Sequence, residues 1–247
     1  NGAPGKIKAD LTKVSQIVFA SRYAMQPNEF TVDNVRAIGK YEEKDSSNFF
    51  PFVDQYGQYI HKDWKGKMHS DEELVVAANK QVTELKASNG APDIGKYGGW
   101  TAGPKLKASG FFRTEKVNGK WWMVDPEGYL FWTAGLNCVA SNSVSTGITQ
   151  REEYFKLLPE KDSELGQFYG QSDIAPHGFY ADKTPYDTYN FYQSNLYRKY
   201  GEDWLKDFQD IAHLRIKDWG MNTIGFMSDF GATRQGRTHY VGSIWIN

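Results

Sequence analysis

The sequence contains one cysteine, Cys138, among 247 residues. A single thiol excludes an internal disulfide and a zinc site built from cysteines. Long apolar runs are missing too: the mean hydropathy is −0.63, and no run approaches the about 18 apolar residues typical of a transmembrane helix. The first ten residues, NGAPGKIKAD, lack a signal-peptide pattern. We therefore expect any export signal to have been removed or to lie outside this sequence.

An excess of one charge is also missing. The 29 Lys and Arg residues nearly balance 30 Asp and Glu residues, and the formal net charge is −1. This balance argues against a nucleic-acid-binding protein, which would carry a strong basic excess. No GxSxG, Walker or GxGxxG motif occurs. His61 and His69 lack a third metal ligand at helical spacing, and Cys138 has no assignable histidine partner, so no metal or cofactor is predicted.

Aromatic residues are abundant, with 8 Trp, 15 Tyr and 15 Phe making up 15% of the chain. Ordinary core packing is one explanation. The other is binding of a polysaccharide, because the C–H faces of sugar rings stack on aromatic faces.

The first half of the chain mixes strands and one helix. Residues 14–23 and 30–38 read as two strands, which need a larger sheet because an isolated hairpin is marginal in water. Residues 41–48 are a polar linker. Ser70 to Glu73 form a capping box, which predicts a helix to about residue 88. Its apolar face is Leu74, Ala78, Val82 and Leu85. The glycine-rich residues 88–110 read as a loop.

A β-meander is predicted next. Residues 111–117 and 120–124 are strands joined by Asn118-Gly119, the pair typical of a type I′ hairpin turn. Asp125-Pro126-Glu127-Gly128 is a type I turn by composition. Residues 129–139 then form a nearly continuous apolar run, which favours one strand buried on both faces.

The last part predicts a βα pattern. Residues 141–199 are long, polar and aromatic, with a short helix near 151–157. An amphipathic helix at 203–219 follows, then buried strands at 221–227 and 240–246. Apolar strands alternating with helices indicate an α/β fold with a parallel sheet, here the first strands of a (β/α)8 barrel.

Barrel function gathers at the carboxyl ends of the strands. The residues predicted to lie there, and to bind substrate, are Asn137, Ser228, Asp229 and Trp245. Asp229 is the one acid directly at a strand end; it could bind a sugar hydroxyl, cap the next helix, or have no special role. Glu152 and Glu153 read as first-turn helix acids. A glycosidase needs two carboxylates, so no catalytic residue is assigned.

The run from Gly110 to Val139 resembles the entry to the catalytic barrel of glycoside hydrolase family 50 β-agarases. The matching motifs are Gly110-Phe111-Phe112, Lys120-Trp121-Trp122, Val124-Asp125-Pro126-Glu127-Gly128 and Gly135-Leu136-Asn137-Cys138-Val139. The sequence departs from the family at Asn137, where Asp is expected. Residues 149–159 resemble the segment after the first barrel strand. Residues 219–225 with Ser228-Asp229 resemble the second strand, and residues 240–246 resemble the third. Residues 14–38 resemble the close of a carbohydrate-binding-module-like β-sandwich, and residues 52–70 the segment that joins it to the barrel.

This resemblance implies three regions: the end of the sandwich at 1–40, a linker and helix at 41–109, and the first strands of an incomplete (β/α)8 barrel at 110–247. It implies a secreted or periplasmic retaining hydrolase of β-1,4 bonds in agarose-type galactans, with agarose, porphyran and carrageenan all open as substrates. The acid/base is expected after the fourth barrel strand and the nucleophile near the seventh, so both catalytic acids would lie in the remainder of a longer chain. A non-catalytic carbohydrate-binding protein, and a structural domain whose aromatics only fill a core, are the alternatives.

Overall fold

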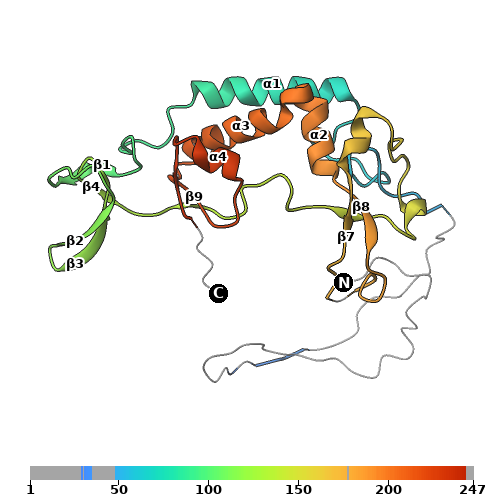
Figure 1. Cartoon of the computed structure of the whole chain (residues 1–247), viewed down its shortest axis with the longest axis horizontal. Helices are drawn as coiled ribbons and strands as arrows, with labels where there is room; N and C mark the ends of the chain where they lie inside the picture. The colour runs from blue at the N-terminus through green and yellow to red at the C-terminus, as the bar shows by residue number, and fades with distance from the viewer. Residues whose placement is uncertain (1–28, 30, 35–47, 177, 243–247) are drawn as a thin grey trace.

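The computed structural model describes residues 29, 31–34, 48–176 and 178–242 (Figure 1). The strand predicted at 14–23 lies outside the described residues. Of the strand predicted at 30–38, only residues 31–34 are described, and they carry no strand, with Asn34 at φ of 55°. Nearly all of the sandwich predicted at 1–40 therefore lies outside the described residues. The same is true of the end of the strand predicted at 240–246.

The helix predicted after the capping box is confirmed as α1 (Asp71–Ala87). The Glu73 amide donates to Ser70 Oγ at 3.2 Å, and the Glu73 carboxylate accepts from the His69 amide at 2.8 Å. Leu74, Ala78 and Leu85 are buried. This face packs on helices α2 (Phe191–Tyr200) and α3 (Trp204–Asp218), along which α1 lies in Figure 1. No helix in the described part of the chain is long and apolar enough to cross a membrane.

The predicted meander is confirmed within a four-stranded antiparallel sheet. Its strands are β1 (Trp100–Lys105), β2 (Arg113–Val117), β3 (Lys120–Val124) and β4 (Tyr129–Phe131), in the order β1-β4-β3-β2. Strand β1 lies in the segment that we predicted to be a loop. Its sequence contains Gly103 and Pro104, and its pairing with β4 is irregular, which explains why the strand pattern is weak. The predicted region boundary at 109/110 therefore passes between two strands of one sheet.

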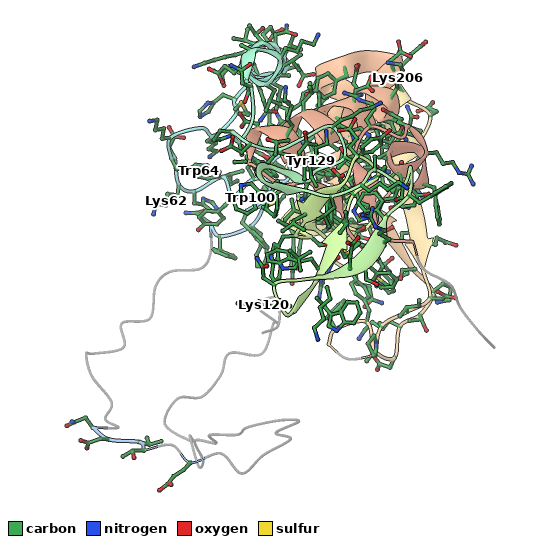
Figure 2. The ribbon with its side chains drawn as sticks, turned by 90° about the vertical axis from the view of Figure 1, so that its left-hand side faces the viewer. Lys62, Trp64, Trp100, Lys120, Tyr129 and Lys206 are labelled. Carbon is green, nitrogen blue, oxygen red and sulfur yellow. The ribbon has the colours of Figure 1, made fainter. Side chains whose placement is uncertain are left out.

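Both predicted turns of the meander are present. Asn118 and Gly119 have φ values of 50° and 79°, as a type I′ turn requires. Figure 2 shows Lys120 at the tip of this hairpin. At the second turn, the Gly128 amide donates to the Asp125 carbonyl at 3.0 Å. The fully buried Asp125 carboxylate accepts from the amides of Glu127 and Tyr129, both at 2.9 Å, and so fixes the chain reversal.

The prediction of one strand over residues 129–139 is wrong. The run splits into β4 and the short β5 (Gly135–Leu136), which belong to different sheets. Trp132, between them, is 76% exposed. The apolar composition is explained by two successive buried faces rather than by one strand, since Phe131 is buried in the first sheet and Val139 packs beside the second.

Residues 141–199 contain more regular structure than predicted. A three-stranded antiparallel sheet, in the order β6-β8-β7, is formed by β6 (Thr146–Gly147), β7 (Tyr169–Ser172) and β8 (Tyr186–Tyr189). The predicted helix near 151–157 is a single 3-10 turn, η2 (Glu152–Tyr154), and a second one is η3 (Glu164–Phe168). Helix α2 (Phe191–Tyr200) follows. An aromatic core joins these elements: Tyr154, Phe155, Phe168, Tyr189 and Phe191.

The predicted parallel sheet is confirmed over three short strands. They are β5, β9 (Thr223–Ile224) and β10 (His239–Tyr240), in the order β10-β9-β5. Helix α3 (Trp204–Asp218) precedes β9, with the short η4 (Gly201–Asp203) before it and α4 (Phe230–Arg234) after β9. Ile216 of α3, Ile224 of β9 and Ala232 of α4 form the core beside this sheet.

Helix α3 ends as predicted. Gly220 has φ of 69°, its amide donates to the Lys217 carbonyl, and the Met221 amide donates to the Ile216 carbonyl. These two hydrogen bonds form the Schellman motif. It turns the chain directly from α3 into β9.

Candidate functional site

The loops that follow the carboxyl ends of β5 and β9 hydrogen-bond to each other. The Gly225 amide donates to the Leu136 carbonyl at 2.6 Å, and the Cys138 amide donates to the Phe226 carbonyl at 2.8 Å. The Asp229 amide donates to the Val139 carbonyl at 2.9 Å. These bonds extend the parallel pairing beyond the two residues of each strand. We call residues 137–139 and 225–229 the carboxyl-edge cluster.

Asn137 takes the place of a backbone group in this extension. Its Oδ1 accepts from the Phe226 amide at 2.9 Å, while its side chain remains exposed. A side chain at Gly225 would occupy the same space, because a Cβ there would lie 2.2 Å from Asn137 Oδ1. Glycine at 225 therefore allows the Asn137 amide to approach the next strand.

Ser228 makes the matching contact from the other loop. Its Oγ accepts from the Val139 amide at 3.0 Å. Asp229 is the N-cap of α4: its Oδ1 accepts from the Ala232 amide at 3.0 Å and from Gln209 Nε2 at 2.8 Å. Of the three roles considered for Asp229, the structure shows capping.

The structure thus brings together three of the four residues predicted to bind substrate. Asn137, Ser228 and Asp229 lie at the carboxyl edge of adjacent parallel strands, whereas Trp245 lies outside the described residues. Gln209 was missed. It projects from α3, 20 positions before Asp229, and no local sequence pattern marks such a contact.

Two residues of the cluster have left-handed backbone. Cys138 has φ of 58° and Met227 has φ of 57°, and both side chains are exposed. Residues other than glycine adopt this conformation at a cost of about 1–3 kcal/mol each and do so most often at functional sites. Its occurrence at the ends of two neighbouring strands marks this edge as the functional candidate.

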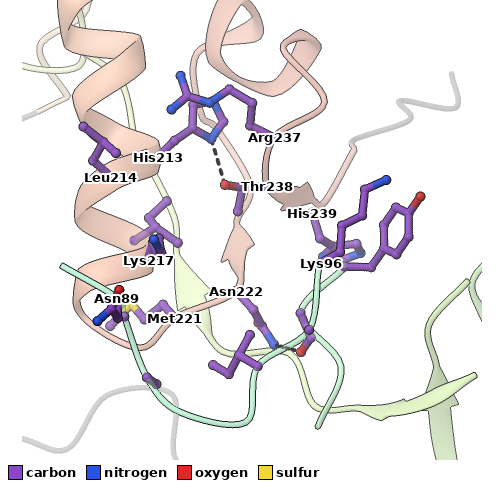
Figure 3. A pocket seen from close by; sticks show the side chains of 17 residues that line it. Asn89, Lys96, His213, Leu214, Lys217, Met221, Asn222, Arg237, Thr238 and His239 are labelled. Atoms are coloured by element: carbon purple, nitrogen blue, oxygen red, sulfur yellow. Dashed lines mark hydrogen bonds between the residues drawn. The ribbon is translucent and has the colours of Figure 1, made fainter. Parts of the chain in front are cut away.

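A cavity of about 490 Å³ lies at the opposite, amino-terminal edge of the same strands (Figure 3). The loop of residues 89–98, helix α3 and the start of β10 line it. Its cationic side chains already have partners: Lys217 Nζ donates to the Ser88 carbonyl at 3.1 Å, Arg237 bonds Asp210 at 2.7 Å, and Lys96 lies over the Tyr97 ring. The cavity therefore lies where these elements pack together, and its three cationic side chains are already engaged within the fold.

Two histidines line this cavity. His213 is buried between the Thr238 hydroxyl at 2.8 Å and the Ala232 carbonyl at 3.1 Å. Burial, followed by the nearby Arg237 charge, lowers the pKa of His213. His239 packs against the Phe112 and Phe131 rings, and burial lowers its pKa as well. Both ring nitrogens of His213 are therefore engaged within the fold.

The remaining histidines considered in the sequence are surface groups. His61 Nε2 lies 2.8 Å from the Phe49 carbonyl, and His69 lies 3.3 Å from both Asp63 and Glu73. Within the described ranges, no three His, Cys, Asp or Glu residues are grouped as a metal ion would need. Cys138, for which no histidine partner was assignable, is exposed.

Comparison with known proteins gives relatives of one kind. No protein-family model matches the chain. Over 255 residues it is 33% identical to β-agarase B of Vibrio sp. (strain JT0107); the match covers 94% of this chain and 26% of that protein. The chain thus spans about a quarter of the length of this curated relative.

Solved structures agree. An exo-β-agarase superposes with a TM-score of 0.72 at 31% identity, over 82% of this chain and 33% of that chain. PfGH50B, whose name carries the family number, superposes with a TM-score of 0.71 at 29% identity, over 81% of this chain and 31% of the other. Both the sequence and the backbone arrangement of the described residues are therefore similar to part of these proteins.

Proposed function

Because this chain is an agarase-like segment related to glycoside hydrolase family 50, we propose that it forms part of a glycoside hydrolase that degrades agarose. One observation carries the proposal: the 33% identity to β-agarase B extends over 94% of the chain. The proposed reaction is hydrolysis of β-1,4-galactosidic bonds with retention of configuration, by two carboxylates that lie elsewhere in the longer protein.

The parallel sheet supports a finer structural proposal. Strands β5, β9 and β10 are adjacent, parallel and in chain order, as the first three strands of a (β/α)8 barrel would be. In such a barrel the carboxyl-edge cluster would lie at the mouth where substrate binds. Asn137, Ser228 and Asp229, together with Trp245, would then contact the galactan.

The test uses the longer natural polypeptide that contains this chain, incubated with agarose. We expect oligosaccharide products, separated by chromatography, and new reducing ends that proton NMR shows first in the β configuration. Products that appear first in the α configuration would exclude retention while leaving the agarase proposal intact. Absence of any product would overturn the activity itself.

Exposed aromatic side chains favour a second candidate, a non-catalytic carbohydrate-binding protein. Trp121, in β3, is 70% exposed, and Trp132, directly after β4, is 76% exposed. Retention of the protein on an agarose column, without turnover of the column matrix, would support this candidate over the hydrolase. Either function places the protein where algal polysaccharide is found, so we propose that it is secreted or periplasmic.

A further inference from the structure

The fold uses one end of the Asn137 side-chain amide, Oδ1, and leaves the other end, Nδ2, available. The Phe226 amide is a donor, so the atom 2.9 Å from it must be the acceptor Oδ1 rather than Nδ2. This contact fixes the orientation of the side chain. Among the described residues, none accepts a hydrogen bond from Nδ2, and the side chain is exposed at the edge of the sheet.

The neighbouring polar side chains also have hydrogen-bond donors and acceptors that the fold does not use. Ser228 Oγ uses a lone pair for the Val139 amide, so its hydroxyl hydrogen remains available. Asp229 uses Oδ1 for both the Ala232 amide and Gln209, so Oδ2 remains available as an acceptor. The cluster therefore offers two donors and one acceptor, a set that matches the hydroxyl and ether oxygens of a sugar.

Charge selects the kind of ligand. Asp229 is the one charged residue in the carboxyl-edge cluster, and its carboxylate would repel a sulfate or carboxylate group. An uncharged oxygen meets no such repulsion and can accept from the neutral Asn137 amide.

We infer that Asn137 is a specificity-determining residue that donates from Nδ2 to an uncharged acceptor oxygen of a galactan. This inference rests on the proposed function. Its key feature is polarity: Asn137 must be a donor toward the substrate while it is an acceptor toward the fold. An aspartate at this position would keep the bond from the Phe226 amide and replace the donor with a negatively charged acceptor.

Asn137→Asp in the longer polypeptide tests this polarity, with Asn79→Asp as the matched control. Asn79 lies on the exposed face of α1, so the control makes the same chemical change away from the sheet. We expect Asn137→Asp to lower kcat/KM on neutral agaro-oligosaccharides by about tenfold or more, as for loss of one hydrogen bond and the repulsion that replaces it. Its thermal midpoint should stay near that of the control.

A pH series provides a readout that a structural role would not change. A protonated aspartic acid is again a donor. The ratio of wild-type to Asn137→Asp kcat/KM should therefore fall as the pH approaches the usual aspartate pKa of about 4. A constant ratio would mean that the donor is not what the substrate requires.

The outcomes separate the two proposals. Wild-type protein without agarose turnover would overturn the proposed function. Wild-type turnover with an unchanged Asn137→Asp enzyme would overturn this inference alone. Strong destabilisation of Asn137→Asp relative to Asn79→Asp would overturn it too, since the fold rather than the substrate would then require the neutral amide.

Discussion

Asn137 and Asn222 bracket the parallel pair β5–β9 from opposite ends. Asn222 Oδ1 accepts from the Ala134 amide at 2.9 Å at the start of the pair, and Asn137 Oδ1 accepts from the Phe226 amide at 2.9 Å at its end. The two amides differ in what remains. Asn222 Nδ2 donates to the carbonyls of Gly98 and Trp132, so its capacity is used within the fold. The fold uses both ends of the Asn222 amide, whereas Asn137 Nδ2 has no partner among the described residues.

This difference predicts that replacing asparagine by aspartate lowers the stability of the sheet at position 222 but not at position 137. Asn222→Asp should destabilise the sheet, because it removes two donated bonds and leaves the Gly98 and Trp132 carbonyls facing a carboxylate. We expect a loss of about 2–3 kcal/mol in the free energy of local opening. Hydrogen exchange of peptides covering β5 and β9 measures it, and Asn137→Asp serves as the comparison. Equal protection in the two variants would contradict the distinction.

The β2–β3 hairpin gives a second stability prediction. Asn118 has φ of 50°, a conformation that a β-branched side chain adopts only under strain. Asn118→Val should therefore lower the stability of the four-stranded sheet by about 1 kcal/mol or more, whereas Asn118→Gly should be tolerated. An unchanged denaturation midpoint for the valine variant would show that the turn is not type I′.

Two variants of Asp229 are needed to separate its roles, because the same carboxylate caps α4 and is proposed to contact the sugar. Asp229→Ala removes both and should cost about 1 kcal/mol of stability together with a fall in kcat/KM. Serine is a good N-cap, so Asp229→Ser should restore most of the stability.

If kcat/KM stays low in Asp229→Ser, the carboxylate contacts substrate. Recovery of both quantities in the serine variant would instead show that Asp229 acts through α4 alone. Steady-state kinetics on agaro-oligosaccharides and thermal unfolding of both variants give the comparison.

His213 predicts a loss of stability on mild acidification. Burial and Arg237 lower its pKa in the folded state, whereas the unfolded chain titrates near the usual value of about 6.5. Below that pH the unfolded state binds a proton that the folded state does not, so stability is full above about pH 7 and falls as the pH drops through 6.

Hydrogen exchange of peptides from α3, at pH values between about 5.5 and 7.5, measures this loss once corrected for intrinsic exchange. His213→Gln removes the titrating group and should flatten the profile relative to the wild type. His61→Gln is the control, since His61 is exposed and its removal should leave the slope unchanged.

Local sequence signals predicted the elements whose causes are local. The Ser70 cap, the Asn118-Gly119 turn and the end of the helix predicted at 203–219 each depend on a few adjacent residues, and all three are confirmed. The division of residues 129–139 between two sheets depends on partners far away in sequence, Trp100 and Thr223 among them. An apolar run carries no information about which partner each residue meets. The edge strand β1 was missed for a different reason, because Gly103, Pro104 and its irregular pairing with β4 weaken the strand pattern.

The candidate site was predictable in position and not in detail. Polar residues after apolar strands predicted Asn137, Ser228 and Asp229, because parallel strands end at a common edge. The sequence could not assign which oxygen or nitrogen of each side chain the fold would use. That assignment depends on the Phe226 amide and on Gln209, which reach the cluster only through the folded arrangement of β9 and α3.

The 247-residue chain by itself should not hydrolyse galactan. Retaining hydrolysis needs two carboxylates about 5–5.5 Å apart, one to protonate the leaving oxygen and one to attack the anomeric carbon. Across the described part of the carboxyl edge, Asp229 is the one acid, and its Oδ1 is engaged by the Ala232 amide and Gln209. Loss of an essential catalytic group typically costs several orders of magnitude in rate, and here both acids of the pair are proposed to lie elsewhere.

Purified residues 1–247, incubated with agaro-oligosaccharides beside the longer polypeptide and analysed by chromatography, should yield no product while the longer polypeptide does. Clear turnover by the 247-residue chain would place the catalytic acids within it and overturn this assignment.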